Sequence, residues 1–345
     1  MIEQTHGNIL TADAEALVNT VNCVGVMGKG IALQFKKAFP ENFKAYEAAC
    51  RRGEVMPGRM FVFETGQIFN PRFIINFPTK RHWRGKSRYE DIESGLKALV
   101  KEVQEREIHS IAIPPLGSGF GGLQWTRVKA MIEDAFAKMP EVQVKLFEPK
   151  GSPEAADMPV GTARPNMTIA RALLVKLMQQ YARFAYRLTL LEIQKLAYFL
   201  QESGLDLKLR YVKHLYGPYA HNLNKVLEIL EGHYIQGYGD TQKPDVEITL
   251  LPNANNEADR FLQEDSAAIK NLEKVADLVD GFETPYGMEL LSSVHWTAIH
   301  EDEAHDAESA VVAMARWNDR KQRLFKPEHI RLAWERLKEE GWVTS

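Results

Sequence analysis

Short apolar runs alternate with helical stretches through residues 1–150, and this alternation restricts the fold more than any other feature of the sequence. The apolar runs end at Gly, Pro or Asn, as β-strands do. In the most regular helical stretch, Ile92, Leu96 and Leu99 fall on one face. Strands that alternate with helices build a parallel or mixed sheet that helices cover on both faces. The predicted strands are a first short strand before residue 7, then 15–22, 59–65, 72–79, 109–117 and 142–148, and the predicted helices are 29–38, 40–51, 88–106 and 125–138.

Residues 151–166 differ in composition from the rest of the chain. They are rich in Pro, Gly, Ala and acidic residues and have no hydrophobic period, which is typical of a linker. The chain beyond them is mainly helical, and its Gly217–Pro218 pair predicts a turn. The sequence therefore predicts an α/β fold class: a three-layer α/β/α domain over 1–150, a linker, and a second, mainly helical domain over 167–345. In the second domain the predicted helical stretches are 167–204, 222–231, 257–280 and 328–340, with one strand at 245–251.

Composition excludes several classes of protein. A length of 345 residues suits two domains, each able to bury a core. The two cysteines, Cys23 and Cys50, make neither a disulfide framework nor a metal cluster, which favours a reducing compartment. The N-terminus lacks a signal-peptide pattern, and no apolar run approaches the length of about 18 residues that a membrane helix needs. We therefore expect a cytoplasmic protein that binds no metal and no membrane.

The net charge of −3 is unevenly distributed. Residues 1–150 carry 21 Lys and Arg against 17 Asp and Glu, a balance of 21 − 17 = +4. Residues 151–345 carry 22 against 29, a balance of 22 − 29 = −7. A mildly basic domain joined to an acidic one indicates a different partner for each, although drift between two solvated surfaces also explains the difference.

Two glycine-rich loops each lie between a predicted strand and a predicted helix. They are "GVMGKG" at 25–30 and "LGSGFGG" at 116–122. A loop of this kind offers backbone N–H groups and the positive end of a helix to phosphate oxygens. One such loop often makes only a turn, but two at one end of a sheet can bind both halves of a pyrophosphate. Neither loop is a P-loop, and "GVMGKG" does not follow the G-x-G-x-x-G dinucleotide-binding pattern.

The loops, with "GNIL" and "ALVNTVN" before them, resemble the ligand loops of macrodomains, which bind ADP-ribose. "MGKGIALQF" and "LGSGFGGLQW" are similar to the branch that removes ADP-ribose by means of a lysine. The whole chain resembles the DNA ADP-ribosyl glycohydrolase antitoxins, which oppose a DNA-modifying toxin. This resemblance implies that Asn22 hydrogen-bonds the distal ribose close to the bond that is cut, and that ADP-ribose is ligand and product with no cofactor. It also implies ligand-binding roles for Asn8, Ile9, Thr20, Gly28, Lys29, Gly30, Ile31, Leu116, Gly117, Ser118, Gly119, Phe120 and Gly121.

Lys80 is the predicted catalytic residue. It follows a predicted strand at the edge where α/β sheets carry their ligands. A lysine whose pKa is lowered by burial and by cationic neighbours can attack the anomeric carbon of the distal ribose and form a Schiff base. The alternative is a solvated surface lysine, as most lysines are. Lys29, despite its loop, is predicted to screen phosphate charge and not to catalyse.

One position departs from the family pattern. Lysine-dependent relatives that act on modified proteins carry an aspartate where this chain has Gly121. The absence of an acid fits a substrate whose leaving group is a DNA base. It also fits a non-catalytic ADP-ribose reader, and a hydrolase of ADP-ribosylated protein or ADP-ribose esters stays as a further alternative.

A basic run follows the predicted nucleophile. "KRHWRGKSR" at 80–88 combines Lys and Arg with His82 and Trp83. Positive charges beside an aromatic ring suit a single nucleic-acid strand, with the charges on phosphates and the ring on a base. A solvated basic loop is the alternative. The predicted partner is ADP-ribosylated single-stranded DNA, contacted by Arg81, His82, Trp83, Arg84 and Lys86.

The second domain resembles the SocA-like (Panacea) domains of antitoxins in its "QKLAYFLQ" helix and "YGPY" segment. The resemblance implies that this domain binds a cognate DNA ADP-ribosyltransferase toxin, and its acidic charge suits a partner that grips DNA with a basic groove. If toxin binding alone gave protection, the second domain would be sufficient. The candidate contact residues are Glu301, Asp302, Glu303, Asp306 and Glu308, for which solvated charge is an equal explanation.

Overall fold

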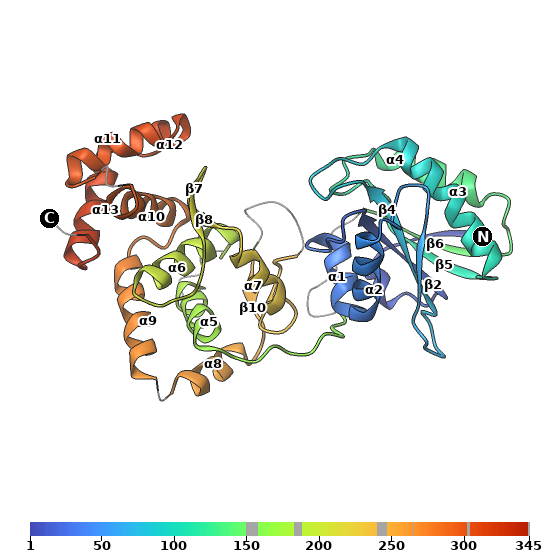
Figure 1. Ribbon diagram of the computed structural model, residues 1–345, viewed down its shortest axis with the longest axis horizontal. Coiled ribbons are helices and arrows are strands. Elements are labelled where there is room, and N and C mark those ends of the chain that lie inside the picture. The colour runs from blue at the N-terminus through green and yellow to red at the C-terminus, as the bar shows by residue number, and fades with distance from the viewer. Residues whose placement is uncertain (150–157, 183–187, 240–246, 264, 302–303, 344–345) are drawn as a thin grey trace. The chain divides into compact units, whose positions relative to one another are not determined.

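The computed structural model describes the chain except for residues 150–157, 183–187, 240–246, 264, 302–303 and 344–345. The chain divides into two compact units (Figure 1). Unit 1 comprises Met1–Ala163 with Gly239–Gln242, and unit 2 comprises Arg164–Tyr238 with Lys243–Ser345. None of the described helices is long and apolar enough to cross a membrane.

Unit 1 is built on a six-stranded mixed sheet with the order β1-β6-β5-β2-β4-β3. All neighbouring strands are parallel except β3, which runs antiparallel to β4 at one edge. The central strands are buried on both faces, because helices cover both sides, and they therefore read as continuous apolar runs. The strands are β1 (Ile2–Thr5), β2 (Ala16–Asn22), β3 (Phe61–Glu64), β4 (Phe73–Lys80), β5 (Ser110–Ile113) and β6 (Gln143–Phe147).

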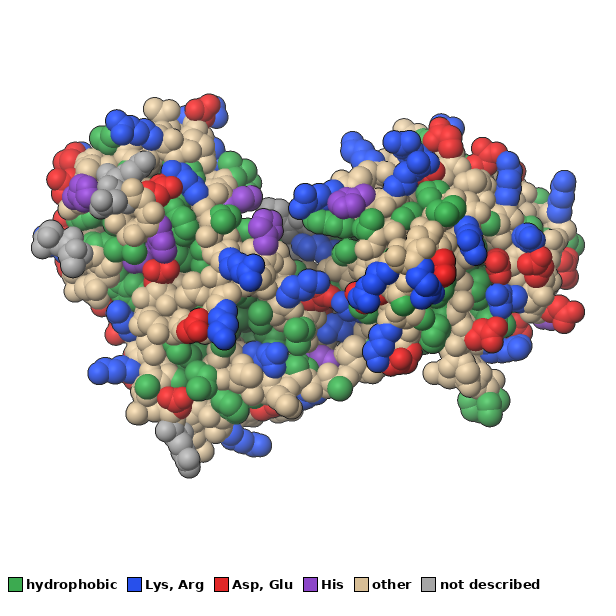
Figure 2. Space-filling view, viewed as in Figure 1, with side chains coloured by type: hydrophobic (Ala, Val, Ile, Leu, Met, Phe, Trp, Pro, Cys, Tyr) green, Lys and Arg blue, Asp and Glu red, His purple; other side chains and the backbone are tan. Residues whose placement is uncertain are grey.

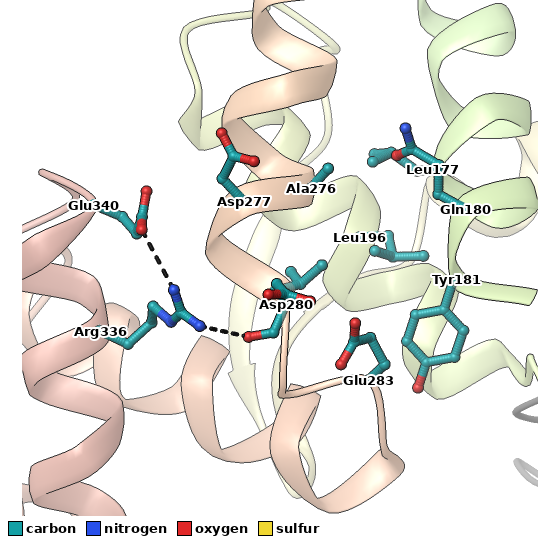
Figure 3. Close-up of a pocket in the computed structure, with 11 residues that line it drawn as sticks. Leu177, Gln180, Tyr181, Leu196, Ala276, Asp277, Asp280, Glu283, Arg336 and Glu340 are labelled. Carbon is teal, nitrogen blue, oxygen red and sulfur yellow. Dashed lines mark hydrogen bonds and ion pairs between the residues drawn. The ribbon is translucent and has the colours of Figure 1, made fainter. Parts of the chain in front are cut away.

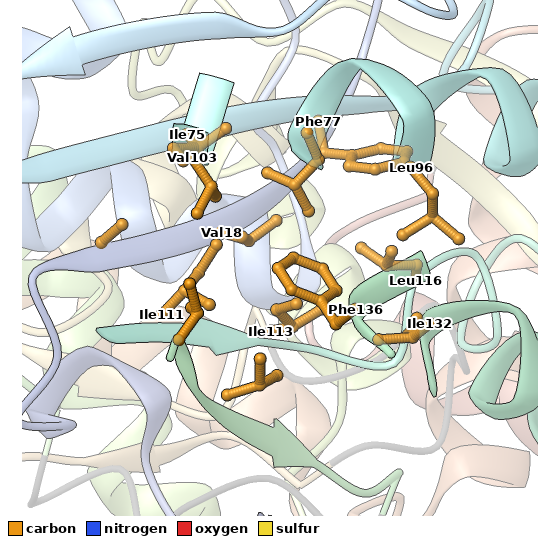
Figure 4. Close-up of a cluster of buried hydrophobic side chains, with 14 of the residues drawn as sticks. Val18, Ile75, Phe77, Leu96, Val103, Ile111, Ile113, Leu116, Ile132 and Phe136 are labelled. Carbon is orange, nitrogen blue, oxygen red and sulfur yellow. The ribbon is translucent and has the colours of Figure 1, made fainter. Parts of the chain in front are cut away.

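Two pairs of helices cover the sheet of unit 1. Helices α3 (Tyr89–Glu105) and α4 (Trp125–Phe136) pack on one face, where Leu96, Ile132 and Phe136 meet strand residues such as Ile111 (Figure 4). Helices α1 (Gly30–Ala38) and α2 (Pro40–Arg51) pack on the other face, where Phe35 and Tyr46 are fully buried. These layers confirm the predicted α/β/α fold class.

The predicted strand at 109–117 is too long. Strand β5 ends at Ile113 because Pro114 and Pro115 follow it and cannot donate to a strand ladder. The strand therefore ends four residues earlier than predicted, and the chain passes through the two prolines into the second glycine loop. The other predicted strands and helices of unit 1 match the structure to within about two residues at each end, the usual spread of such boundaries.

Unit 2 is mainly helical, as predicted. The predicted helix at 257–280 is two helices, because Asp265 accepts a hydrogen bond from Ala268 N and begins a new one. The long stretch at 167–204 contains two helices, the second opened by a Thr189 capping box. The described helices are α5 (Ile169–Ala182), α6 (Leu190–Glu202), α7 (Leu223–Leu230), α8 (Ala254–Leu262), α9 (Ser266–Val279), α10 (Pro285–Ile299), α11 (Ala307–Trp317), α12 (Asp319–Leu324) and α13 (Pro327–Glu339).

Short strands complete unit 2. Strands β7 (Tyr211–His214) and β8 (Gly217–Ala220) form an antiparallel hairpin. The prediction that Gly217–Pro218 forms the turn is wrong: the turn lies at 215–216, and Gly217 begins β8 with φ of 92°. The predicted strand at 245–251 is described only at β10 (Thr249–Leu250), which pairs with β9 (Ile235–Gln236), and residues 245–246 lie outside the described residues.

Candidate functional site

The carboxyl ends of β2 and β4 lie side by side and place two predicted site residues together. The strands are parallel, and Asn22, the last residue of β2, pairs with Lys80, the last residue of β4. The register shifts between Val21 and Asn22, which marks a bulge or irregularity where the pair of strands ends. In parallel sheets this edge is where loops form ligand sites.

The Asn22 side chain organises the first glycine loop. Its Oδ1 accepts from the N–H groups of Val24 (3.0 Å) and Val26 (3.3 Å), and its Nδ2 donates to Val26 O (2.5 Å). The Tyr46 hydroxyl donates to Asn22 O at 2.6 Å from beneath. Asn22 is only 7% exposed. Its amide is thus engaged by the loop, and a contact with a distal ribose stays a prediction.

The first loop leads directly into α1. Gly30 begins the helix with φ of 58°, a conformation that favours glycine, and Lys29 precedes it in extended form. The first turn of a helix has N–H groups without intrahelical partners, which suits an anion. The Gly30 N–H donates to Gly239 O at 2.6 Å, within the same unit. Burial lowers the pKa of Lys29.

The second loop folds back on itself and leaves three amides unused. Ser118 N donates to Pro115 O, and Leu123 N donates to Gly117 O, both at 3.0 Å. The N–H groups of Gly119, Phe120 and Gly121 have no acceptor among the described residues. A row of unpaired N–H groups is an anion-binding feature.

The two glycine loops meet, as the topology predicts. A Cβ built on Gly30 would lie 2.6 Å from Cε2 of Phe120, so Phe120 packs directly against the start of α1. Lys80 Nζ donates to Phe120 O at 2.5 Å. The predicted nucleophile and both loops are therefore in contact at one edge of the sheet, with the Phe120 ring 40% exposed.

Burial lowers the pKa of Lys80, which increases its neutral fraction and its nucleophilicity. A second potential nucleophile lies beside it, since Cys23 Sγ donates to Lys80 O at 3.3 Å. Burial raises the pKa of the Cys23 thiol to about 11, so this group is protonated and weakly nucleophilic at neutral pH. Of these two groups, only the lysine has the pKa shift that a nucleophile needs.

The loop geometry explains why position 121 carries glycine. A Cβ there would lie 2.2 Å from Gly117 O and 2.2 Å from Ser87 Oγ, both far inside van der Waals contact. An aspartate at Gly121 would require the loop to be rebuilt. The missing acid is thus a structural feature of this loop and not an isolated change of residue.

Asn8 and Ile9, two of the predicted ligand-binding residues, lie just beyond the end of β1. Asn8 caps the 3-10 turn Ile9–Thr11, and its Oδ1 accepts from Leu10 N at 3.0 Å. Asn8 Nδ2 also donates to Met158 Sδ at 3.4 Å. Ile9 is 5% exposed and belongs to the core, which leaves mainly its backbone for a ligand. Sequence reasoning missed Met158 because it lies in the aperiodic segment that predicts a linker.

Other predicted ligand residues take supporting places. Thr20 lies half-buried on β2, Ile31 packs on the core beneath α1, and Leu116 is fully buried below the second loop. Ser118 Oγ donates to Leu116 O at 3.4 Å. Gly28 precedes Lys29 in the first loop.

The basic run combines one anchored side chain with several exposed ones. Arg81 pairs with the buried carboxylate of Asp91 (Nη2 to Oδ1, 3.0 Å) in the first turn of α3. Trp83 is 42% exposed, with His82 stacked on it and Arg84 over its ring at 4.5 Å from the centroid. Lys86 is exposed. Lys and Arg side chains are numerous on unit 1, with acidic side chains among them (Figure 2).

Unit 2 contains a pocket of about 470 Å³ that the sequence did not predict (Figure 3). Its apolar wall includes Leu177 and Leu196, and carboxylates such as Asp277 and Glu283 line the rest. Arg336 pairs with Glu340 and donates to Asp280 O at 2.8 Å. The lining residues come from four helices far apart in sequence, so no local motif signals the pocket.

The predicted toxin-facing acids are engaged within unit 2. Glu301 pairs with Lys213 (2.7 Å), and Glu308 accepts two hydrogen bonds from Arg331. Asp306 caps α11. Asp302 and Glu303 lie outside the described residues. Within the part of the chain that the structure describes, no group of three or more His, Cys, Asp or Glu residues could hold a metal ion.

A mixed sheet that helices cover on both faces, with two glycine loops at its carboxyl edge, is the architecture of a macrodomain, and the Macro domain family model matches residues 18–132. The solved macrodomain of Mycobacterium tuberculosis DarG is 55% identical and covers 44% of this chain and 99% of its own, with a TM-score of 0.43. The DNA ADP-ribosyl glycohydrolase of Thermus aquaticus is 50% identical over 341 residues, 99% of this chain and 94% of the relative. The chain belongs to this family of hydrolases, the DNA ADP-ribosyl glycohydrolases.

A third relative joins two activities in its name. The DNA ADP-ribosyl transferase-DNA ADP-ribosyl glycohydrolase fusion protein of Thermosipho africanus is 32% identical over 158 residues, which is 41% of this chain and 40% of the relative.

Proposed function

We propose that unit 1 hydrolyses ADP-ribose from DNA bases and that Lys80 is the nucleophile. The observation that carries the proposal is the place of the Lys80 amine. It lies at the carboxyl end of β4, with a pKa lowered by burial, and in contact with the second of two glycine loops. The names of the relatives give the substrate class.

The proposed reaction is a hydrolysis, which needs no oxidant or reductant. The neutral Lys80 amine attacks the anomeric carbon of the distal ribose. The N-glycosidic bond breaks, its electron pair leaves with the base, and the base takes a proton from water. Opening of the ribose ring gives a protonated Schiff base on the lysine nitrogen. Water adds to the Schiff base, the amine departs, and ADP-ribose is released, so one water molecule is consumed overall.

The loops would hold the diphosphate during this reaction. The free amides of Gly119, Phe120 and Gly121 are donors for one phosphate, and the start of α1 offers donors and a helix dipole to the other. Lys29 lies beside this second group and would screen its charge. Each of these contacts is made by backbone or by a cation, which suits a ligand with two adjacent anionic groups.

The exposed part of the basic run would hold the DNA strand. The stacked rings of His82 and Trp83 with Arg84 form a surface on which a base can stack, and Lys86 adds positive charge. Arg81 is the exception, because Asp91 already pairs with it. The second loop carries glycine and not an acid at position 121, so in the proposed reaction the departing base takes its proton from water.

The test is release of ADP-ribose from an ADP-ribosylated single-stranded oligonucleotide by the full chain and by Lys80→Ala. We expect the variant to lose activity by about 10³-fold or more while it still binds ADP-ribose. Equal release by both proteins would contradict the role of Lys80. Binding without release by the native protein would indicate a reader, and release from ADP-ribosylated protein but not from DNA would indicate the other hydrolase.

We also infer that unit 2 binds a DarT-like DNA ADP-ribosyltransferase. The Thermosipho relative joins a transferase and a glycohydrolase in one chain, and the acidic balance of residues 151–345 suits a DNA-binding partner. The Lys80→Ala full chain separates binding from hydrolysis: mixed with the transferase, it should still suppress DNA modification, and less so as salt is raised. Modification at the uninhibited rate would contradict the inference.

A further inference from the structure

Ser87, at the end of the basic run, carries a buried hydroxyl that the proposed reaction does not use. Its side chain is 7% exposed, and its Oγ has no hydrogen-bond partner among the described residues. The backbone of Ser87, by contrast, is bonded, since its N–H donates to Gly121 O at 3.0 Å. Buried hydroxyl groups almost always have a partner, so this one calls for an explanation.

The hydroxyl lies inside the second glycine loop. A Cβ built on Gly121 would be 2.2 Å from Ser87 Oγ, and one built on Gly117 would be 3.1 Å from it. The two glycines therefore leave the space that the hydroxyl occupies. Ser87 Oγ stands where the side chain of residue 121 would begin, at the position where protein-acting relatives are expected to carry their acid.

The described residues around this hydroxyl offer it no acceptor, and an anionic ligand would provide one. The amides of Gly119, Phe120 and Gly121 in the same loop also have no acceptor among the described residues. Four unpaired hydrogen-bond donors thus lie in one short loop and its immediate support. Ser87 and Gly121 are buried, so leaving their donors unpaired costs free energy that a phosphate group would recover, whereas the exposed amides of Gly119 and Phe120 exchange water for the same acceptor.

We propose that the Ser87 hydroxyl is a ligand-binding group of this site, which donates to the diphosphate of ADP-ribose when the loop 117–121 holds it. The proposal rests on the proposed function of unit 1. Because Ser87 Oγ is buried in the free protein, the loop has to move for the contact to form. The Lys80 amine must leave Phe120 O to reach the sugar, and the loss of this hydrogen bond frees the loop to move.

This assignment also connects the two halves of the substrate. Ser87 lies near the end of the basic run that would hold DNA, and its N–H donates to Gly121 O in the loop that would hold the diphosphate. Occupation of the loop by ADP-ribose would therefore act directly on the end of the DNA-binding run. Gly121 is required in this arrangement because it provides the room for the hydroxyl.

The experiment compares the native full chain with Ser87→Ala by calorimetric titration with ADP-ribose and by thermal unfolding without ligand. We expect the Kd for ADP-ribose to rise about tenfold, as for loss of one hydrogen bond to a charged group. The Tm of the free variant should be equal or higher, because the substitution removes a buried hydroxyl that has no partner. Ser94→Ala is the matched control, since Ser94 is on α3 and donates to Asp91 O instead.

The outcomes separate this inference from the proposed function. An unchanged Kd in Ser87→Ala, with normal binding by the native chain, overturns the role of Ser87 and leaves the function intact. A lower Tm together with weaker binding means that the hydroxyl supports the loop, and also overturns the inference. Failure of the native chain to bind ADP-ribose overturns the proposed function itself.

Discussion

Lysine side chains are withdrawn from water in both units, and burial lowers their pKa in both, yet only one of the two environments can do chemistry. In unit 1, Lys80 is half-buried and donates to a loop carbonyl, Phe120 O. In unit 2, Lys195 and Lys321 are fully buried among α6, α10 and α12, and burial lowers the pKa of each. A lowered pKa is therefore not enough to identify a catalytic lysine.

The difference lies in what surrounds each amine. Lys321 Nζ donates to Glu289 Oε1 and Ser293 Oγ, both at 2.8 Å, and Arg320 also pairs with Glu289. Lys195 Nζ donates to Pro218 O at 2.6 Å. These amines are enclosed by protein groups, whereas the Lys80 amine is held at the end of a strand, beside loops with unpaired donors. Access to a ligand distinguishes the two environments, and each prediction below tests that distinction.

The largest effect is expected at Lys80. Lys80→Arg keeps a positive charge but cannot form a Schiff base, so release of ADP-ribose from modified DNA should fall by about 10³-fold or more. Borohydride added during turnover should attach ADP-ribose covalently to the native chain and not to Lys80→Arg, which mass spectrometry would detect. Lys29→Arg, a change at the other lysine of the site, should still be trapped. Equal trapping of native chain and Lys80→Arg would show that another group forms the intermediate.

The next effect is on folding and should leave chemistry unchanged. Lys321→Met removes one partner of the buried Glu289 carboxylate and should lower the free energy of unfolding by about 3 kcal/mol. Lys195→Met is the matched control, because Lys195 bonds a neutral carbonyl and a Met of similar size should change stability by about 1 kcal/mol or less. Chemical denaturation measures both. A loss of DNA ADP-ribose release in either folded variant would mean that the buried lysines of unit 2 also serve the reaction.

A smaller effect is expected at Asp91, a carboxylate of unit 1 that is buried but lies close to the proposed site. This buried carboxylate pairs with Arg81, the residue after the proposed nucleophile, and so fixes the chain that carries Lys80. Asp91→Asn should lower kcat about tenfold and leave ADP-ribose affinity unchanged, because a misplaced nucleophile slows the chemical step. Glu93→Gln, which breaks a surface pair with Lys97 on the same helix, should have no effect. Equal kcat values for native chain and Asp91→Asn would remove Asp91 from the list of positioning residues.

The sequence predicted unit 1 much better than unit 2, and the reason is physical. In unit 1, strands and helices alternate in short segments with clear ends, so their order implies the sheet and the meeting of both glycine loops. In unit 2, α10 is buried on nearly every side from Gly287 to Thr297, so it has no polar face and no period to detect. The hairpin of β7 and β8 was not predicted, because Gly217–Pro218 indicates a turn two residues after the actual one.

The site, like the fold, has some features that are local in sequence and could be predicted, and others that only the structure shows. Lys80 and the loops followed from strand ends and a family resemblance, because these features are local in sequence. The packing of Ser87 into the space beside Gly121 joins residues far apart in the chain, and only the structure brings them together. The pairing of Arg81 with Asp91 is a similar case, in which a basic residue of the run bonds a buried carboxylate of α3.

The smallest effect concerns the pH dependence of stability and tests Lys321, a fully buried lysine of unit 2. Burial lowers the pKa of Lys321 from 10.5 to about 8. The unfolded chain therefore binds more protons than the folded chain between these pH values, and the free energy of unfolding should rise with pH across that window, by about 1 kcal/mol per pH unit. Burial raises the pKa values of Cys23 and Cys50, which act in the opposite direction within this range, and of Tyr198 and Tyr211, which do so above pH of about 10. The contribution of Lys321 is therefore the difference between the native chain and Lys321→Met from pH of about 8 to about 9.5. Denaturation of the native chain and of Lys321→Met should diverge across this range, and parallel curves would mean that Lys321 keeps its proton because Glu289 holds it.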